Sequence, residues 1–213
     1  MEFDQFLGYL PKILNHPLPA IAAHAKMAPA GRAESLLPEF YANKNARNSA
    51  VMMLCYPKDN LTHLVLIRRN TYPGIHSAQI SFPGGKVEAA DKDLAHTALR
   101  ETFEEIGIAQ DKVNIVKAFS SLYIPPSNFL VFPFLGIATQ PVRFLPNPAE
   151  VEQVIELPLH VLLDDSTITA VEIATSYAQK ISVPAFIVQG HIVWGATAMI
   201  LSELKETIKS VLI

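Results

Sequence analysis

The stretch from residue 79 to residue 108, QISFPGGKVEAADKDLAHTALRETFEEIGI, decides how this part of the chain folds. It opens with a short run typical of a β-strand, Gln79 to Phe82, and turns at Pro83-Gly84-Gly85. Apolar residues then recur at helical spacing from Leu94 to Ile106, and Gly107 follows at the position of a C-cap. The stretch therefore predicts a strand, a glycine turn and a helix, in that order.

Three glutamates of the predicted helix point the same way. At about 100° per residue, Glu101, Glu104 and Glu105 gather on one surface beside the apolar face. Their like charges oppose each other at a cost of roughly 0.2–0.5 kcal/mol per pair, and two of them lie at the helix end that prefers cations. One interpretation is a solvated acidic face. The other is a site for a hard divalent cation, Mg²⁺ or Mn²⁺, which would turn this repulsion into attraction.

The residues next to these glutamates fit such a site. Glycines at positions 84 and 85 let the backbone approach a ligand closely, and amides of such turns can face phosphate oxygens; the alternative is an ordinary turn. Arg100 precedes Glu104 by one helical turn, so we expect its guanidinium to hold that carboxylate in position.

Hydrophobic patterning places a helix at each end of the chain and a series of strands between them. The predicted helices cover residues 3–14 and 196–212, and residues 16–47 read as an irregular wrap. Hairpins are predicted at residues 51–56 with 61–68 and at 181–188 with 191–194, and further strands at 113–119, 129–138 and 152–156. This order of strands and helices is typical of an α/β fold.

Length and composition favour one folded domain with extensions. At about 150 residues per domain, 213 residues are too few for two full domains. Half of the residues are hydrophobic and 17% are charged, which argues against disorder and indicates a sizeable core. Because the strand pattern begins at Ser49, we expect residues 49–213 to form the main domain, with residues 1–48 as a helix and wrap that belong to the same unit.

Charge, cysteine content and the lack of long apolar runs limit the kinds of partner and location that we expect for this chain. A net charge of −3 without a basic block argues against a nucleic-acid partner. The single cysteine, Cys55, lies in an apolar run and is expected to be a buried thiol, with no internal disulfide and no cysteine zinc site. The start lacks the pattern of a signal peptide, and no apolar run approaches the ~18 residues of a membrane span. We therefore expect a cytoplasmic protein that binds a small molecule and no membrane.

Residues 100–108, RETFEEIGI, together with the preceding Gly84–Gly85, resemble the Nudix box. This box is the signature of hydrolases that cleave nucleoside diphosphates linked to another moiety. It ends in R-E-U-x-E-E-x-G-U, where U is a bulky aliphatic residue, and Thr102 is the one departure. The segment before the arginine is one residue longer than in the general box, and Asp91 is nearest to the box's earlier glutamate.

The longer segment and residues His76 to Gly85, HSAQISFPGG, are similar to the branch of the family that includes coenzyme A diphosphatases. Further similarity lies in residues 123–129, 147–151 and 193–198. In the upstream motif of that branch, Gly74 and Ala78 stand where a second arginine and a glycine are usual. The resemblance to the family runs from about Ser49 onward.

The resemblance implies a Nudix α/β/α sandwich with a mixed β-sheet and a metal-dependent hydrolase. It implies that Mg²⁺ or Mn²⁺ is held by Glu101, Glu104, Glu105 and the carbonyl of Gly85, with Arg100 as a further catalytic residue. Coenzyme A or acyl-coenzyme A would be cleaved at its diphosphate bridge. The products would be 4′-phosphopantetheine, or its acyl form, and adenosine 3′,5′-bisphosphate.

Six residues are expected to bind the substrate: Arg68, Arg69, His76, Gln79, Gly84 and Gly85. The two arginines end a strand, where guanidinium groups favour phosphate, and alternation sends at most one of them into the site. A lone histidine is more often a structural side chain, so this alternative stays open for His76.

Three further alternatives stay open. The general base is Glu104, Glu105 or Glu150, of which the two helix residues are favoured. The substrate is a coenzyme A compound or another one, such as ADP-ribose, a dinucleoside polyphosphate or an oxidised dNTP, and a binding module without catalysis is the rival class. The last helix is suited both to a homodimer interface and to covering the sheet.

Overall fold

The computed structural model describes residues 1–71, 79–175 and 178–212. His76, Gly74 and Ala78 lie outside the described residues. The helices are α1 (Phe3–Asn15), α2 (Ile21–Lys26), α3 (Pro38–Tyr41), α4 (Leu94–Ile106), α5 (Leu159–Leu163) and α6 (Gly195–Leu212). The strands are β1 (Arg47–Lys58), β2 (Leu61–Arg69), β3 (Ile80–Ser81), β4 (Gly84–Lys86), β5 (Asn114–Ala118), β6 (Leu122–Ile124), β7 (Phe129–Ile137), β8 (Val151–Pro158), β9 (Ile168–Thr175), β10 (Ala178–Val188) and β11 (His191–Trp194).

Strand β1 is the centre of a mixed sheet, which confirms the sheet type predicted from the sequence. It runs parallel to β7 and antiparallel to β2 and β4. The hairpin with β2 closes at Asp59 and Asn60, whose positive φ angles of 50° and 62° suit a tight turn that matches the strand twist. Toward its start, β1 pairs with β4, whereas the end of β2 pairs with β3. The glycine turn is therefore built into the sheet, between β1 and β2.

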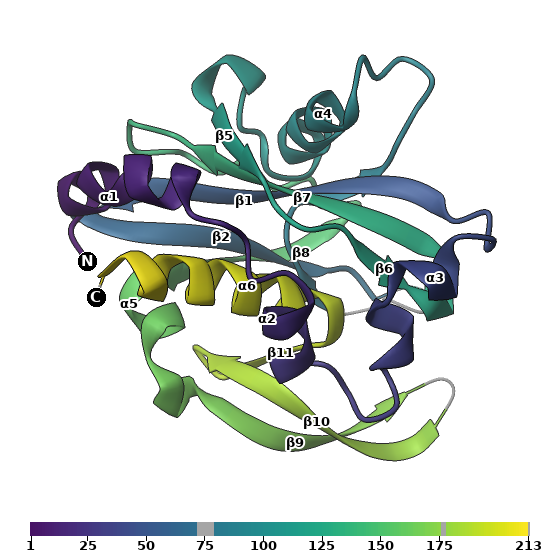
Figure 1. The fold of residues 1–213 in the computed structure, drawn as a ribbon. Helices are drawn as coiled ribbons and strands as arrows, with labels where there is room; N and C mark the ends of the chain where they lie inside the picture. Colours follow the sequence, from purple (N-terminus) through teal and green to yellow (C-terminus); the bar gives the residue numbers. More distant parts are fainter. Residues whose placement is uncertain (72–78, 176–177, 213) are drawn as a thin grey trace.

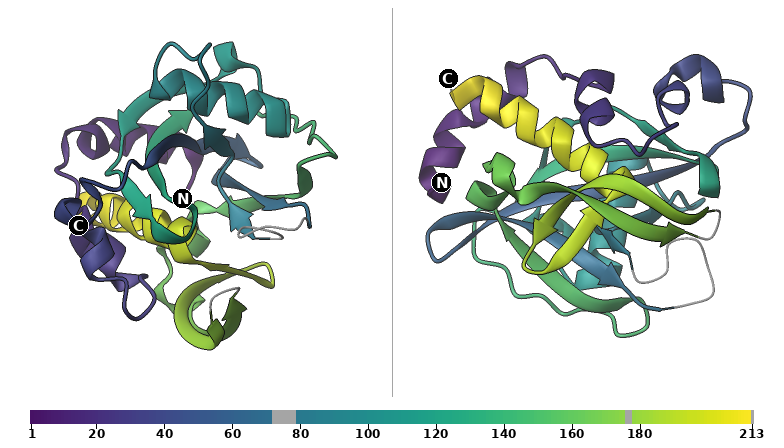
Figure 2. Two further views of the ribbon diagram at one scale, coloured as in Figure 1. Left: turned by 90° about the vertical axis from the view of Figure 1, so that its right-hand side faces the viewer. Right: turned by 90° about the horizontal axis from the view of Figure 1, so that it is seen from below.

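The layers follow from how the helices cover this sheet. Helix α4 lies on one face, and α6 lies on the other together with α1 and α2 (Figure 1). This is the expected α/β/α sandwich. The three-stranded antiparallel sheet of β9, β10 and β11 packs on the far side of α6 and adds a further layer (Figure 2).

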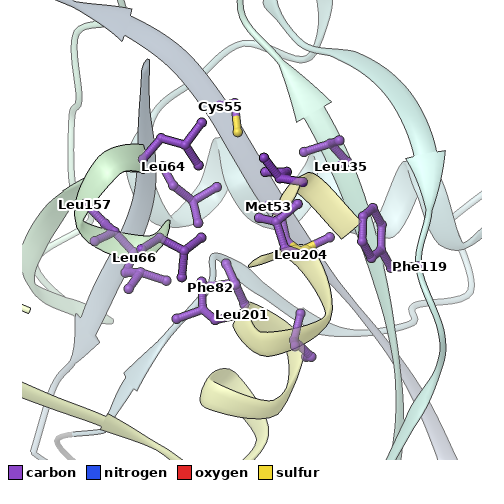
Figure 3. Packing of buried hydrophobic residues seen from close by; sticks show 14 of the residues in the cluster. Met53, Cys55, Leu64, Leu66, Phe82, Phe119, Leu135, Leu157, Leu201 and Leu204 are labelled. Atoms are coloured by element: carbon purple, nitrogen blue, oxygen red, sulfur yellow. The ribbon is translucent and has the colours of Figure 1, made fainter. Parts of the chain in front are cut away.

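Alternating side chains of β1 divide the core between the two faces. Met52 and Leu54 face α4, whereas Met53 and Cys55 face α6. Burial raises the pKa of the Cys55 thiol to about 12, and the prediction of a buried thiol is confirmed. Figure 3 shows the α6 side of the core, with side chains from both sheet and helix, among them Met53, Leu64, Leu66, Phe82, Phe119, Leu135, Leu157, Leu201 and Leu204.

Several elements were not predicted. Strand β6 and helix α5 are too short to give a periodic pattern, with 3 and 5 residues. Strand β9 is an edge strand, and its stability comes from pairing with β10 rather than from its own sequence. The predicted irregular wrap contains α2 and α3, and β1 begins at Arg47, two residues before the predicted start of the sheet.

A buried carboxylate on α6 fastens the N-terminal segment to the rest of the chain. Glu203 is fully buried and accepts hydrogen bonds from the backbone N–H groups of Ala20 (3.0 Å) and Ser120 (3.1 Å). His24 Nε2 lies 3.3 Å from the same carboxylate. Burial by itself would raise the pKa of Glu203, but the hydrogen bonds from His24 and Ser120 outweigh it and hold the pKa below its ordinary value. Helix α6 thereby joins the N-terminal segment to the β5–β6 connection.

Candidate active site

Helix α4 has the boundaries predicted from the sequence. The Asp93 side chain accepts a hydrogen bond from the backbone N–H of His96 (2.7 Å) and caps the first turn. Gly107 ends the helix in the left-handed conformation at φ 73°, with its N–H bonded to the Phe103 carbonyl. The helix packs on β1 and β4, which brings its glutamates over the glycine turn.

At both positions of the glycine turn, neighbouring atoms lie so close to the backbone that only glycine fits. The carboxylate of Glu101 lies directly against Gly85, at the place where a Cβ atom would stand. Gly84 has φ 152°, and a side chain there would overlap the backbone of Ala50 and Val51. The structure thus brings together Glu101 and Gly85, two of the residues that the family resemblance implies as metal ligands.

Arg100 connects two of the glutamates to the turn before the helix. Its Nη1 donates to Glu101 Oε1 and to Glu104 Oε2, both at 2.9 Å, which confirms the predicted contact with Glu104. Its Nη2 also donates to the carbonyl of Lys86 (3.0 Å). Arg100 therefore fixes two glutamates relative to β4.

Asp91 holds this arginine and is a site residue that the sequence reasoning did not select. Its carboxylate accepts hydrogen bonds from Nε and Nη2 of Arg100, both at 2.9 Å, and from the hydroxyl of Thr97 (2.9 Å). The side chain is fully buried, and Arg100 holds the pKa of Asp91 well below its ordinary value. The signal available in the sequence was its position, because Asp91 is nearest to the earlier glutamate of the general box.

Glu105 faces inward rather than toward solvent. Its Oε1 accepts from Nη1 of Arg69 and its Oε2 from the backbone N–H of Gly84, both at 2.8 Å. Burial raises the pKa of Glu105 to about 7, although Arg69 and the Gly84 N–H act in the opposite direction. The neighbouring Arg68 instead pairs with Glu152 at the surface (3.2 Å). The prediction that at most one of the two arginines points into the site is therefore confirmed.

Gln79, another residue expected to bind the substrate, lies beside the ion pair of Arg69 and Glu105. The carbonyl of Gln79 accepts a hydrogen bond from the backbone N–H of Arg69 at 3.1 Å. Gln79 thus adjoins the strand end that carries the arginine partner of Glu105. The strand pairing of β2 and β3 brings these residues together, although ten positions separate them in the sequence.

The connection between β7 and β8 covers the end of α4. Leu145 N–H donates to the carbonyl of Ile106, and Asn147 N–H donates to the carbonyl of Glu105, both at 2.9 Å. These bonds satisfy carbonyl groups that a helix end leaves free.

Burial raises the pKa of Glu101, and although Arg100 lowers it, the charges of Glu104 and Glu150 add to the increase. Glu150, the third candidate base, therefore lies within electrostatic reach of the cluster.

The donor chemistry of this cluster fits a hard divalent cation. Two guanidinium groups, those of Arg69 and Arg100, contact four carboxylates, those of Asp91, Glu101, Glu104 and Glu105, and the charge of Glu150 acts on the same cluster. The excess of negative oxygen suits Mg²⁺ or Mn²⁺. Within the described part of the chain, no three acidic, histidine or cysteine side chains are close enough together to hold an ion in this conformation. The bonds to Arg100 account for the present directions of two of these side chains.

Comparisons with known proteins agree on one family. The model of the NUDIX domain matches residues 46–175. The chain is 32% identical to the uncharacterized Nudix hydrolase NudL of Photorhabdus laumondii, over 78% of this chain and 87% of that protein. It is 34% identical to the human mitochondrial coenzyme A diphosphatase NUDT8, over 79% of this chain and 73% of that protein. Among solved structures, the Nudix hydrolase RenU of M. smegmatis is 12% identical, with a TM-score of 0.53 over 78% of this chain and 87% of that one.

Proposed function

Since the chain belongs to the Nudix hydrolase family, we propose that it is a metal-dependent diphosphatase of coenzyme A or acyl-coenzyme A. The products are 4′-phosphopantetheine, or its acyl form, and adenosine 3′,5′-bisphosphate. The observation that carries the reaction class is the set of glutamates that α4 holds over Gly84–Gly85. The choice of substrate rests on the segment from Gln79 to Gly85 with the residues before it, and on the likeness to a relative named a coenzyme A diphosphatase.

The metal ligands in this proposal are Glu101, Glu104, Glu105 and the carbonyl of Gly85. An Mg²⁺ or Mn²⁺ ion held there would neutralise charge on the diphosphate and would lower the pKa of water for attack at phosphorus. In that role, Glu101 and Glu104 would each lose the hydrogen bond from Nη1 of Arg100. The bonds from Nε and Nη2 of Arg100 to Asp91 would remain and would keep Arg100 beside the two glutamates.

The chain's own residues then orient the substrate and take up a proton. The proposal assigns the binding of phosphate oxygens to Arg69 and to the turn residue Gly84, which both lie beside Glu105. The general base is one of the helix residues, Glu104 or Glu105, in preference to Glu150, which lies on the connection before β8. His76 and Gln79 stay proposed as substrate-binding residues, whereas Arg68 pairs with Glu152 at the surface and is not kept in this role.

A panel of diphosphate compounds with product analysis tests this function. In the presence of Mg²⁺ or Mn²⁺, we expect adenosine 3′,5′-bisphosphate to be released from coenzyme A and acetyl-coenzyme A, and the release to stop when a chelator removes the metal. Turnover confined to ADP-ribose, dinucleoside polyphosphates or oxidised dNTPs would assign another substrate. A thermal shift with ligand but no products from any compound would indicate a binding module without catalysis.

The Gly85→Ala variant tests the contact between the glycine turn and the catalytic helix. The added Cβ occupies the position of the Glu101 carboxylate and displaces it, so we expect kcat/KM for the preferred substrate to fall by about 10²-fold. Gly8→Ala in α1 is the matched control, because a Cβ there meets no other atom within 4 Å. Full activity of Gly85→Ala would contradict the role given to Glu101.

The location of the protein in the cell and its oligomeric state are not part of the proposed reaction. Across the described residues, no helix combines the length and the apolar character that crossing a membrane requires. A cytoplasmic location, the absence of a nucleic-acid partner and homodimer formation stay predictions from the sequence. We also propose that residues 1–48 and 49–213 act as one unit, since α1 and α2 pack against α6.

A further inference from the structure

The start of α6 contacts β3, the short strand that leads into the glycine turn. Strand β11 packs beside β3, and the chain passes from β11 into α6 at Gly195, which has a φ of 64°. In the first turn of α6, the hydroxyl of Thr197 donates a hydrogen bond to the carbonyl of Ile80 at 2.9 Å. These two residues are 117 positions apart in the sequence. The last helix is therefore bonded directly to the strand before the glycine turn.

The register of the sheet turns the carbonyl of Ile80 toward this partner. Ile80 lies opposite Arg68, and in the next pair the N–H of Arg69 donates to the carbonyl of Gln79 at 3.1 Å. Because only every second residue of an antiparallel pair bonds to the neighbouring strand, the carbonyl of Ile80 points away from β2. The side chain of Thr197 is buried and supplies the hydrogen bond that this carbonyl does not receive from β2.

Strand β3 is connected to the catalytic helix through Arg69. The backbone N–H of Arg69 is bonded to Gln79, and its guanidinium Nη1 donates to Glu105 Oε1 at 2.8 Å. Ile67 packs in the part of the core under α4, and Arg69, two residues later, extends from the same face of β2. The side chain of Ile80 packs on the opposite face, with α6. The backbone of β3 thus links Thr197 on one face of the sheet to the ion pair on the other.

Another buried threonine of α6 makes a bond that serves only its own helix. The hydroxyl of Thr207 donates to the carbonyl of Glu203 at 2.7 Å, four residues earlier in α6. Thr207 and Thr197 have the same side chain, the same helix and a backbone carbonyl as the acceptor. They differ in what they hold, because the Thr197 bond fixes a strand of the site and the Thr207 bond does not.

We propose that Thr197 is a positioning residue of the active site. Its hydroxyl fixes the backbone of β3 at Ile80, and β3 in turn holds Gln79 and the main chain of Arg69 in place. The inference rests on the proposed function where it assigns substrate binding to these last two residues. The glutamates bonded to Arg100 are held on α4 and β4 instead. Substrate binding therefore depends on Thr197 more than the metal ligands do.

The Thr197→Val variant keeps the shape of the side chain and removes the donor. We expect KM for the preferred diphosphate substrate to rise by about 10-fold and kcat to fall by less than about 3-fold. Thr197→Ser keeps the hydroxyl, so its KM should stay within about 3-fold of the wild-type value. Thr207→Val is the matched control and should leave both constants within about 2-fold of the wild type.

Amide hydrogen exchange measures the position of β3 without substrate or metal. The N–H of Arg69 reports its bond to Gln79, so exchange at this amide should become about 10-fold faster in Thr197→Val. Amides in the centres of β1 and β7 should keep their wild-type exchange rates. Thr197→Ser and Thr207→Val should leave the exchange at Arg69 unchanged.

The two measurements together decide the role of Thr197. Faster exchange throughout Thr197→Val would show a general loss of stability and would overturn the assignment. So would a wild-type KM in this variant, or an Arg69 amide that exchanges at the wild-type rate. If the wild-type protein cleaves none of the diphosphate compounds, the proposed function fails, and the exchange at Arg69 alone decides whether Thr197 positions β3.

Discussion

The Glu105→Gln variant is expected to lose turnover by about 10³-fold or more while it keeps its fold. Glutamine can neither contribute a negative charge to a metal site nor accept a proton from water. Glu105 is fully buried and is bound by Arg69 and by the Gly84 amide, so the substitution keeps the volume but removes the charge between two donors. Steady-state kinetics with the preferred substrate measures the loss, and circular dichroism checks the fold.

The control for this variant is a partly buried glutamate on a different helix. Glu206→Gln removes a carboxylate of α6 that pairs with Lys26 at 2.7 Å, away from α4, and should leave kcat within about 2-fold of the wild-type value. If Glu105→Gln kept full activity in the presence of saturating Mg²⁺ or Mn²⁺, the assignment of the metal and base roles to the helix would be wrong.

The Asp91→Asn variant is expected to reduce the free energy of unfolding by about 2–3 kcal/mol at pH 7. The asparagine side chain has one oxygen in place of two, so it can accept only one of the two hydrogen bonds that Nε and Nη2 of Arg100 donate. Its NH₂ group then faces Arg100, whose charge has lost its buried partner. Because Arg100 then holds Glu101 and Glu104 less firmly, activity should fall as well. Urea denaturation measures the stability, and kinetics on the folded variant measures the activity.

The pH dependence distinguishes the charge of Asp91 from a packing effect. The pKa of Asp91 is lower in the folded protein than in the unfolded chain, so its charge stabilises the fold above about pH 4 and less as the pH falls below this. The difference between the wild-type protein and Asp91→Asn should therefore shrink between about pH 5 and pH 3. Asp111→Asn, at an exposed position, should change stability by less than about 0.5 kcal/mol, and a constant difference for Asp91→Asn would refute the role of the charge.

The local parts of the site were predictable from the sequence. Helix α4 has strong periodicity, a capping aspartate and a C-cap glycine, so its limits and its glutamate surface follow from spacing alone. The pair Arg100 and Glu104 is separated by one turn of one helix, and its contact was predicted for the same reason.

The rest of the site depends on tertiary contacts that spacing does not encode. Glu105 binds Arg69 because the pairing of β2 with β3 and of β4 with β1 brings two distant segments under α4. The bond from Asn147 to the end of α4 depends on a connection without regular structure.

The position of α6 has a consequence for how the protein is made. The first two helices pack against α6, and Glu203 bonds to Ala20 and to His24, so these contacts join residues from opposite ends of the sequence. While a ribosome is still synthesising residues 195–212, the part of the main sheet that α6 covers has its apolar side chains exposed. Completion of this core must therefore wait until α6 leaves the exit tunnel, and the exposed apolar surface makes the chain prone to aggregation during that interval.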